Sequence, residues 1–142
     1  MKKTLKKAII FTIIGLVLGV YFREFTKWNG FVEDGALIGP TSLSFMHTHT
    51  LTLGTVMTLL FGTILNQQGL GLQSLGKRWV FYEIGVYLTV LMMFIRGNIQ
   101  VLNINLSNAL DASISGLAGL SHIILGVSFI LILLKLYKTA EH

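Results

Sequence analysis

Four long apolar runs separated by short polar stretches dominate the chain, and they cover residues 8–22, 40–65, 79–95 and 112–134. A helix needs about 20 mostly apolar residues to cross a hydrocarbon core ~30 Å thick. The last three runs meet this length, and Leu5 with the aliphatic stems of Lys6 and Lys7 extends the first. The pattern predicts an all-α integral membrane four-helix bundle, one domain over residues 1–142, with helices at about 5–23, 41–65, 79–97 and 112–135.

The composition agrees with a membrane protein. Apolar residue types make up 53% of the chain and charged types only 12%, whereas a soluble domain carries about a quarter charged residues. A soluble enzyme, a disordered chain and a coiled coil all fit this composition poorly. The chain has no cysteine, which excludes disulfides, thiolate metal sites, iron–sulfur clusters and covalently attached haem.

The basic residues predict how the four spans are oriented. Most of the eleven lie at span ends on one side: Lys2, Lys3, Lys6, Lys7, Lys77, Arg78, Lys135 and Lys138. Only Arg23, Lys27 and Arg96 lie at the other ends. Cytoplasmic ends of membrane spans are enriched in Lys and Arg, so both termini are predicted to be cytoplasmic. The net charge of +5 does not indicate nucleic-acid binding, because these residues do not gather on one exposed face.

Three histidines lie inside the predicted spans, where ionisable residues are costly and are functional candidates. They are His47 and His49 on the second span and His122 on the fourth, whereas His142 is interpreted as tail. At a rise of 1.5 Å per residue, His47 and His49 lie ~9–13 Å below the outer end of their helix and His122 ~13–15 Å below its own. All three are therefore predicted at a similar depth in the outer half of the membrane.

The spacing of His47 and His49 restricts what they can bind. Residues two apart on a regular helix differ by about 200° in direction, so these rings point to opposite sides and serve different partners. Zinc hydrolases of the H-E-x-x-H type instead place their two His on one face. No carboxylate lies at the depth of the histidines, which also disfavours a zinc hydrolase.

Small residues accompany the histidines. Gly54 is expected on the face of His47, and Gly119 belongs to a stripe of small residues beside His122. A slot of this kind accepts either the backbone of a neighbouring helix or a flat cofactor with axial His ligands. A single buried His can also serve only as an interhelical hydrogen-bond former, but three at one depth favour ligation. Arg96, at the outer end of the third span, either reaches the lipid headgroups or pairs with haem propionates.

Two resemblances extend this interpretation. The stretches Tyr21–Phe31, Met46–Gly54 and Gly119–His122 resemble a bacterial family of small four-helix membrane proteins classed as a domain of unknown function. More remotely, the His47-Thr-His49 helix is similar to the H-x-H helix of the haem–copper oxidase catalytic subunit, whose two His bind different haems. That subunit has twelve helices in three groups of four. The resemblance implies a homotrimer of this chain, with haem between protomers and Arg96 near the propionates.

Together these observations predict a b-type haem protein of the bacterial cytoplasmic membrane that transfers electrons, with a redox partner, or binds a diatomic gas. His47, His49 and His122 are the candidate iron ligands, paired either between the second and fourth spans of one protomer or between His47 and His49 of neighbouring protomers. Copper is a lesser candidate, because methionines such as Met46, Met57, Met92 and Met93 are soft ligands. The alternatives are a small transporter or channel protomer, and an accessory subunit without a cofactor.

Overall fold

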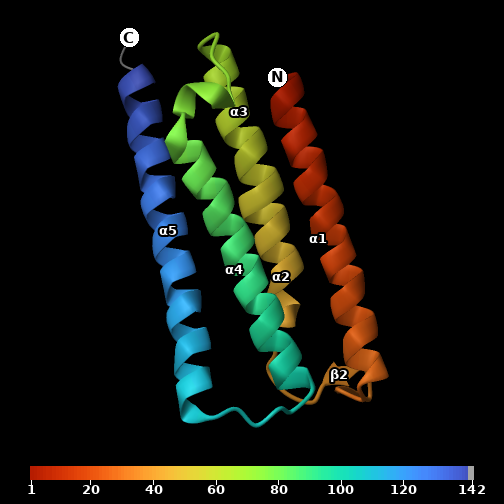
Figure 1. The fold of residues 1–142 in the computed structure, drawn as a ribbon. Coiled ribbons are helices and arrows are strands. Elements are labelled where there is room, and N and C mark those ends of the chain that lie inside the picture. The colour runs from red at the N-terminus through yellow and green to blue at the C-terminus, as the bar shows by residue number, and fades with distance from the viewer. Residues whose placement is uncertain (141–142) are drawn as a thin grey trace.

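The computed structural model describes residues 1–140 and consists almost entirely of helix (Figure 1). The helices are α1 (Lys2–Trp28), α2 (Leu43–His49), α3 (Met57–Gln67), α4 (Lys77–Val101) and α5 (Asn108–Ala140). A π-helix, η1 (Thr50–Val56), joins α2 to α3, so these three form one continuous span. Four spans are long and apolar enough to cross a membrane, which confirms the predicted all-α, four-span fold. His142 lies outside the described residues.

The spans begin and end beyond most of the predicted limits. α1 continues through the polar residues after Tyr21 as far as Trp28, and α5 begins at Asn108, ahead of its apolar run. The predicted limits followed hydrophobicity, whereas backbone hydrogen bonding continues into the polar flanks on both sides. At the start of α5, Ser107 Oγ accepts from Leu110 N at 3.4 Å, and Asp111 lies in the first turn, where a helix favours negative charge.

Both described ends of the chain lie at one end of the bundle, here called the terminal end, together with the connection between α3 and α4 (Figure 1). That connection contains a short 3₁₀ helix, η2 (Leu72–Leu75). The opposite end, here called the loop end, carries the α4–α5 connection and a small antiparallel hairpin of β1 (Val32–Glu33) and β2 (Ala36–Leu37). Asp34 and Gly35 form its turn with φ of 48° and 80°, the left-handed region that Asp and Gly tolerate.

Two buried clusters hold the helices together. The larger lies toward the terminal end and includes Phe11, Phe61, Tyr82 and Ile132, with the rings of Phe61 and Tyr82 packed edge to face. The smaller lies at the loop end around Leu43, Met46 and Val101. α5 packs mainly on α4, whereas α1 packs on α2 and η1, so the four spans form an open row in which α4 and the α2–η1–α3 span are central (Figure 1).

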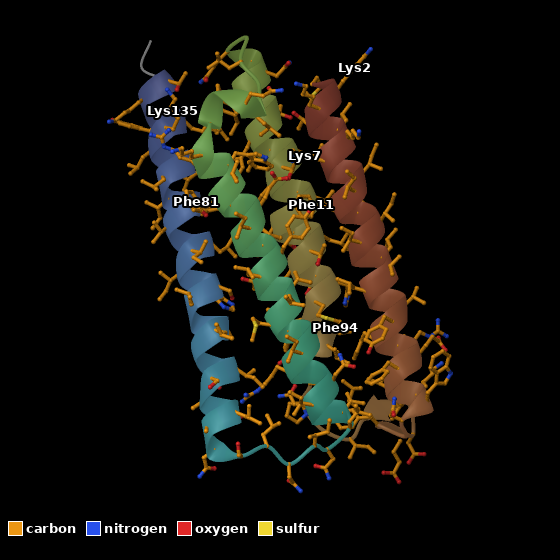
Figure 2. The ribbon with its side chains drawn as sticks, in the orientation of Figure 1. Lys2, Lys7, Phe11, Phe81, Phe94 and Lys135 are labelled. Carbon is orange, nitrogen blue, oxygen red and sulfur yellow. The ribbon has the colours of Figure 1, made fainter. Side chains whose placement is uncertain are left out.

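Polar contacts join α1 to α4 across this row. Lys7 forms an ion pair with Glu83, and the Tyr21 hydroxyl donates to Asn98 Oδ1. Figure 2 shows Lys7 and Phe11 on α1, and the Phe11 ring stacks on Tyr87 of α4 with 5.2 Å between ring centroids. Helix α1 is thus fixed to the bundle near both of its ends.

Close backbone approaches determine the relative heights of the helices. A Cβ built on Gly97 would lie 2.5 Å from Leu43 N, so α4 and α2 nearly touch there. A Cβ on Gly85 would lie 2.8 Å from Leu125 Cα, and Thr89 Oγ1 donates to Ser121 Oγ at 3.3 Å. These contacts bring α4 and α5 together along their middle.

Candidate functional site

His47 lies at the interface between α2 and α1. Its ring stacks on Phe22, with 6.5 Å between centroids and 12° between planes, and its Cβ is 3.5 Å from the position of a Cβ on Gly19. The Nδ1 atom is buried and has no hydrogen-bond partner within residues 1–140. The structure therefore places His47 toward α1, enclosed by protein on that side.

His49 and His122 share a different arrangement. His49 Nδ1 lies 2.9 Å from Phe45 O, and His122 Nδ1 lies 2.8 Å from Ala118 O, in each case the carbonyl four residues earlier. A carbonyl oxygen only accepts hydrogen bonds, so each Nδ1 carries the proton and donates it. In a neutral ring the Nε2 atom then keeps its lone pair and is directed away from its own helix. This is the tautomer that binds a metal through Nε2.

The heights of these two histidines match. Leu43 of α2 lies level with Gly97 of α4, and these helices run in opposite directions. His49, six residues after Leu43, is therefore level with about Leu91 of α4. Ser121 of α5 lies level with Thr89 of α4, so His122, one residue further along α5, is level with about residue 88 of α4. The two rings thus differ by about 5 Å in height, at a rise of 1.5 Å per residue. Within residues 1–140, no three His, Cys, Asp or Glu side chains form a group that could hold a metal ion by themselves.

A cleft of about 330 Å³ lies between α4 and α5 in the half of the bundle nearer the loop end. His122 and Arg96 both line it, together with Ser42, Thr89, Met92, Met93, Ile114, Ser115 and Ala118. Ser42 comes from the residue before α2, and His49 lies seven residues further on, close to the same helical face. Three elements therefore bring His122, Arg96 and the His49 face of α2 to one side of the bundle.

Arg96 lies at the loop-end rim of this cleft. Its Nη1 donates to Asp111 Oδ1 at 2.7 Å and to Ser115 Oγ at 3.3 Å. Arg96 also lines a second, polar cleft of about 310 Å³ beyond it, with Gln100, Asn103 and Asp111. The guanidinium thus lies where the histidine cleft meets the polar surface at the end of the bundle.

The two candidate glycines have opposite surroundings. The ring of Phe11 fills the space beside Gly54, where a Cβ would lie 2.5 Å from Phe11 Cδ1. Of the two occupants expected for the slot beside Gly54, a neighbouring helix or a flat cofactor, the structure has the helix α1. Gly119, in contrast, is exposed, and a Cβ there would meet nothing within 4 Å. The slot beside His122 is open.

The π-helix η1 directly follows His49, and the sequence reasoning assumed a regular helix there. A π segment leaves a backbone carbonyl without its usual partner four residues on. Here the Tyr82 hydroxyl donates to Leu53 O at 2.7 Å, and Thr55 Oγ1 lies 3.0 Å from Thr12 Oγ1. Of the methionines named as candidate copper ligands, Met92 and Met93 line the His122 cleft; their position three to four residues before Arg96 is the signal for this placement.

Fold and site define a small multi-pass helical membrane protein with histidines placed within its spans. The chain belongs to the family described as "Protein of unknown function (DUF2871)", which matches residues 1–139. Among the curated proteins and the solved structures, none matches this chain. The predicted membership of an uncharacterised family is thus confirmed, and the resemblance to haem–copper oxidases stays a prediction.

Proposed function

We propose that this chain is a b-type haem protein of the membrane, in which His122 and His49 would hold haem beside the α4–α5 cleft. The observation that carries the proposal is that the His49 and His122 rings make the same hydrogen bond in the same tautomer. Each donates Nδ1–H to its own helix, each keeps Nε2 for a ligand, and the two lie at nearly the same height. This corresponds to the predicted pairing of the second and fourth spans within one protomer.

The surroundings of His122 fit a flat, largely apolar group. Methionine and isoleucine side chains form much of the wall, and Gly119 leaves the adjacent surface uncovered. The cleft is at the lower end of the ~300–1,000 Å³ range of small-molecule sites, so a porphyrin would extend beyond it. We expect a second copy of the chain to cover the remainder, in agreement with the trimer implied by the oxidase resemblance.

Arg96 fits the carboxylate end of such a group. Its guanidinium already binds the carboxylate of Asp111 and lies between the apolar cleft and the polar surface. Guanidinium groups bind carboxylates through charge-assisted hydrogen bonds, so Arg96 would hold a haem propionate. The positive-inside rule places this end outside, with both termini in the cytoplasm of a bacterial cell.

Ligation by two histidines favours electron transfer over gas binding, because it leaves no open position on the iron. Bound haem would supply one-electron redox chemistry, which requires a redox partner. The protein contributes two oriented imidazoles, an arginine for the propionate and an apolar environment.

A second candidate is copper, and one specific observation favours it. His122, Met92 and Met93 line the same cleft, and imidazole with thioether sulfur is a donor set that suits Cu(I). Metal analysis of the purified protein separates the two candidates, since haem supplies iron and a porphyrin spectrum whereas Cu(I) supplies neither.

The test is the haem content per chain of three variants, measured as the pyridine haemochrome after purification in mild detergent. His122→Ala and His49→Ala are expected to lose at least about tenfold in haem affinity, because each removes an axial ligand. His47→Ala is the matched control and is expected to retain haem. Wild-type haem content in all three variants would contradict the proposal, and a transporter or accessory subunit would then be the better hypothesis.

A further inference from the structure

A second cleft lies at the other end of the α4–α5 interface and takes no part in the proposed haem site. Its volume is about 760 Å³. Its walls are mostly apolar and come from Phe81 of α4 and from α5, with Ile123, Ile124, Val127 and Leu131. Figure 2 shows Phe81 on α4 facing α5. Several of these side chains are more than half exposed, so the groove opens to the surface that faces the bilayer.

The groove has a cationic mouth at the terminal end. Lys77 and Arg78, the first two residues of α4, line it together with Ser74 and Gly76. Neither cation forms an ion pair within residues 1–140. The first turn of α4 contains no acidic residue and no side-chain cap, so its free N–H groups add positive potential at the same place.

The length of the groove corresponds to one leaflet of a bilayer. Because Leu125 packs on Gly85, Ile123 is level with about residue 87 of α4, ten residues beyond Lys77. Ten residues of helix rise about 15 Å, which is half of a ~30 Å hydrocarbon core. An acyl chain that begins at the headgroup level and ends near the bilayer centre has this length.

We propose that this groove is a binding site for an anionic phospholipid, with the phosphate at Lys77 and Arg78 and an acyl chain along Phe81, Val127 and Leu131. Basic pockets between membrane helices bind anionic headgroups, and the apolar walls provide the contact for the chain. A zwitterionic phospholipid would fill the same walls, but its own ammonium group would offset the charge of its phosphate at the two cations. The site does not depend on bound haem, so it is tested separately from the proposed function.

The test is native mass spectrometry of the full chain in mild detergent, titrated with phosphatidylglycerol and, in parallel, with phosphatidylcholine of the same acyl chains. We expect wild-type protein to bind phosphatidylglycerol about tenfold more tightly. The double variant Lys77→Gln/Arg78→Gln is expected to lose this preference, since each cation near the headgroup contributes to it. Val127→Trp should weaken the binding of both lipids, because the indole fills the groove without a change in charge.

The matched control is Lys2→Gln/Lys3→Gln, which removes the same charge at the same end of the bundle but from α1 (Figure 2 labels Lys2). It is expected to bind like wild type. Equal weakening in both double variants would overturn the proposal in favour of general surface attraction. Equal affinity for the two lipids would overturn it as well. A dimer whose formation is blocked by Val127→Trp would also overturn it, because a second copy of the chain would then cover the groove. Far-ultraviolet circular dichroism verifies that each variant keeps its helical fold.

Discussion

The flank of the second span that faces α1 and the surface of α5 use glycine in opposite ways. On the α1 flank, the space beside each small residue is filled: Gly54 receives Phe11, Gly62 receives Thr4, and Gly15 of α1 receives Leu51. On α5, a Cβ at Gly116, Gly119 or Gly126 would meet nothing within 4 Å. Glycine permits close packing in the first region and leaves an uncovered surface in the second.

This difference shows that small residues beside a histidine do not by themselves predict a cofactor slot. His47 has glycine neighbours that bring α1 close, and its ring is enclosed. His122 has glycine neighbours that no helix of the same chain covers. The open surface on α5 is where haem, a second copy or lipid can be accommodated, and the filled surface stabilises the bundle.

The largest loss of stability on the α1 flank is expected for Gly54→Leu. The new side chain would overlap Phe11, a fully buried residue of the larger cluster. Overpacking of a core costs about 1–3 kcal/mol, and here the backbone of η1 lies too close to the ring for a simple rotamer change. We expect a lower midpoint of thermal unfolding, monitored by the fluorescence of Trp79, or no folded protein at all. A midpoint equal to that of wild type would show that α1 does not pack here.

The corresponding substitution on the open surface of α5 is Gly119→Leu. Because no protein atom lies near this position, the unfolding midpoint should stay within the range of surface substitutions, about 0.5 kcal/mol in stability. The leucine would instead cover the surface beside His122, and we expect haem content to fall by about tenfold at limiting haem. Gly116→Leu, about 120° around α5 from His122, is the control and should change neither quantity. Equal haem loss in both variants would place the cofactor elsewhere.

Arg96→Gln tests whether the guanidinium at the rim of the cleft holds a haem propionate. The substitution removes the charge that is proposed to hold a propionate and breaks the contact with Asp111. An exposed charge-assisted contact contributes about 1 kcal/mol, so we expect haem to dissociate about fivefold faster, with the same absorption maxima. Transfer of haem to apomyoglobin measures the rate. Asp111→Asn is the companion variant and should slow dissociation, because it frees the guanidinium; a wild-type rate in Arg96→Gln would exclude a propionate contact.

The smallest effect is expected for His47→Phe. The buried Nδ1 of His47 has no hydrogen-bond partner among residues 1–140, and a phenyl ring would continue the stack with Phe22. Removing an unpaired buried acceptor is neutral or stabilising by about 1 kcal/mol. The unfolding midpoint should therefore stay the same or rise, with haem content unchanged. Loss of haem would favour instead the pairing of His47 and His49 between neighbouring protomers.

The sequence predicted the four spans because hydrophobic length is a strong signal, and it located the histidines because depth follows from helix rise. Helix direction also predicted different neighbours for His47 and His49, and the structure shows the α1 contact of His47. The role of Gly54 could not be predicted, because helix periodicity does not reveal which neighbour approaches. The π-helix could not be predicted either, since the Tyr82 hydroxyl that donates to Leu53 O within it comes from a helix distant in sequence.

The most direct test of the central claim is the absorption spectrum of the wild-type protein, purified in detergent after expression with ample haem, first oxidised and then reduced with dithionite. We expect a Soret band and a sharp α band on reduction, with no shift on addition of carbon monoxide, because both histidines are proposed to bind the iron. A flat spectrum would contradict the claim that the open surface of α5 holds haem.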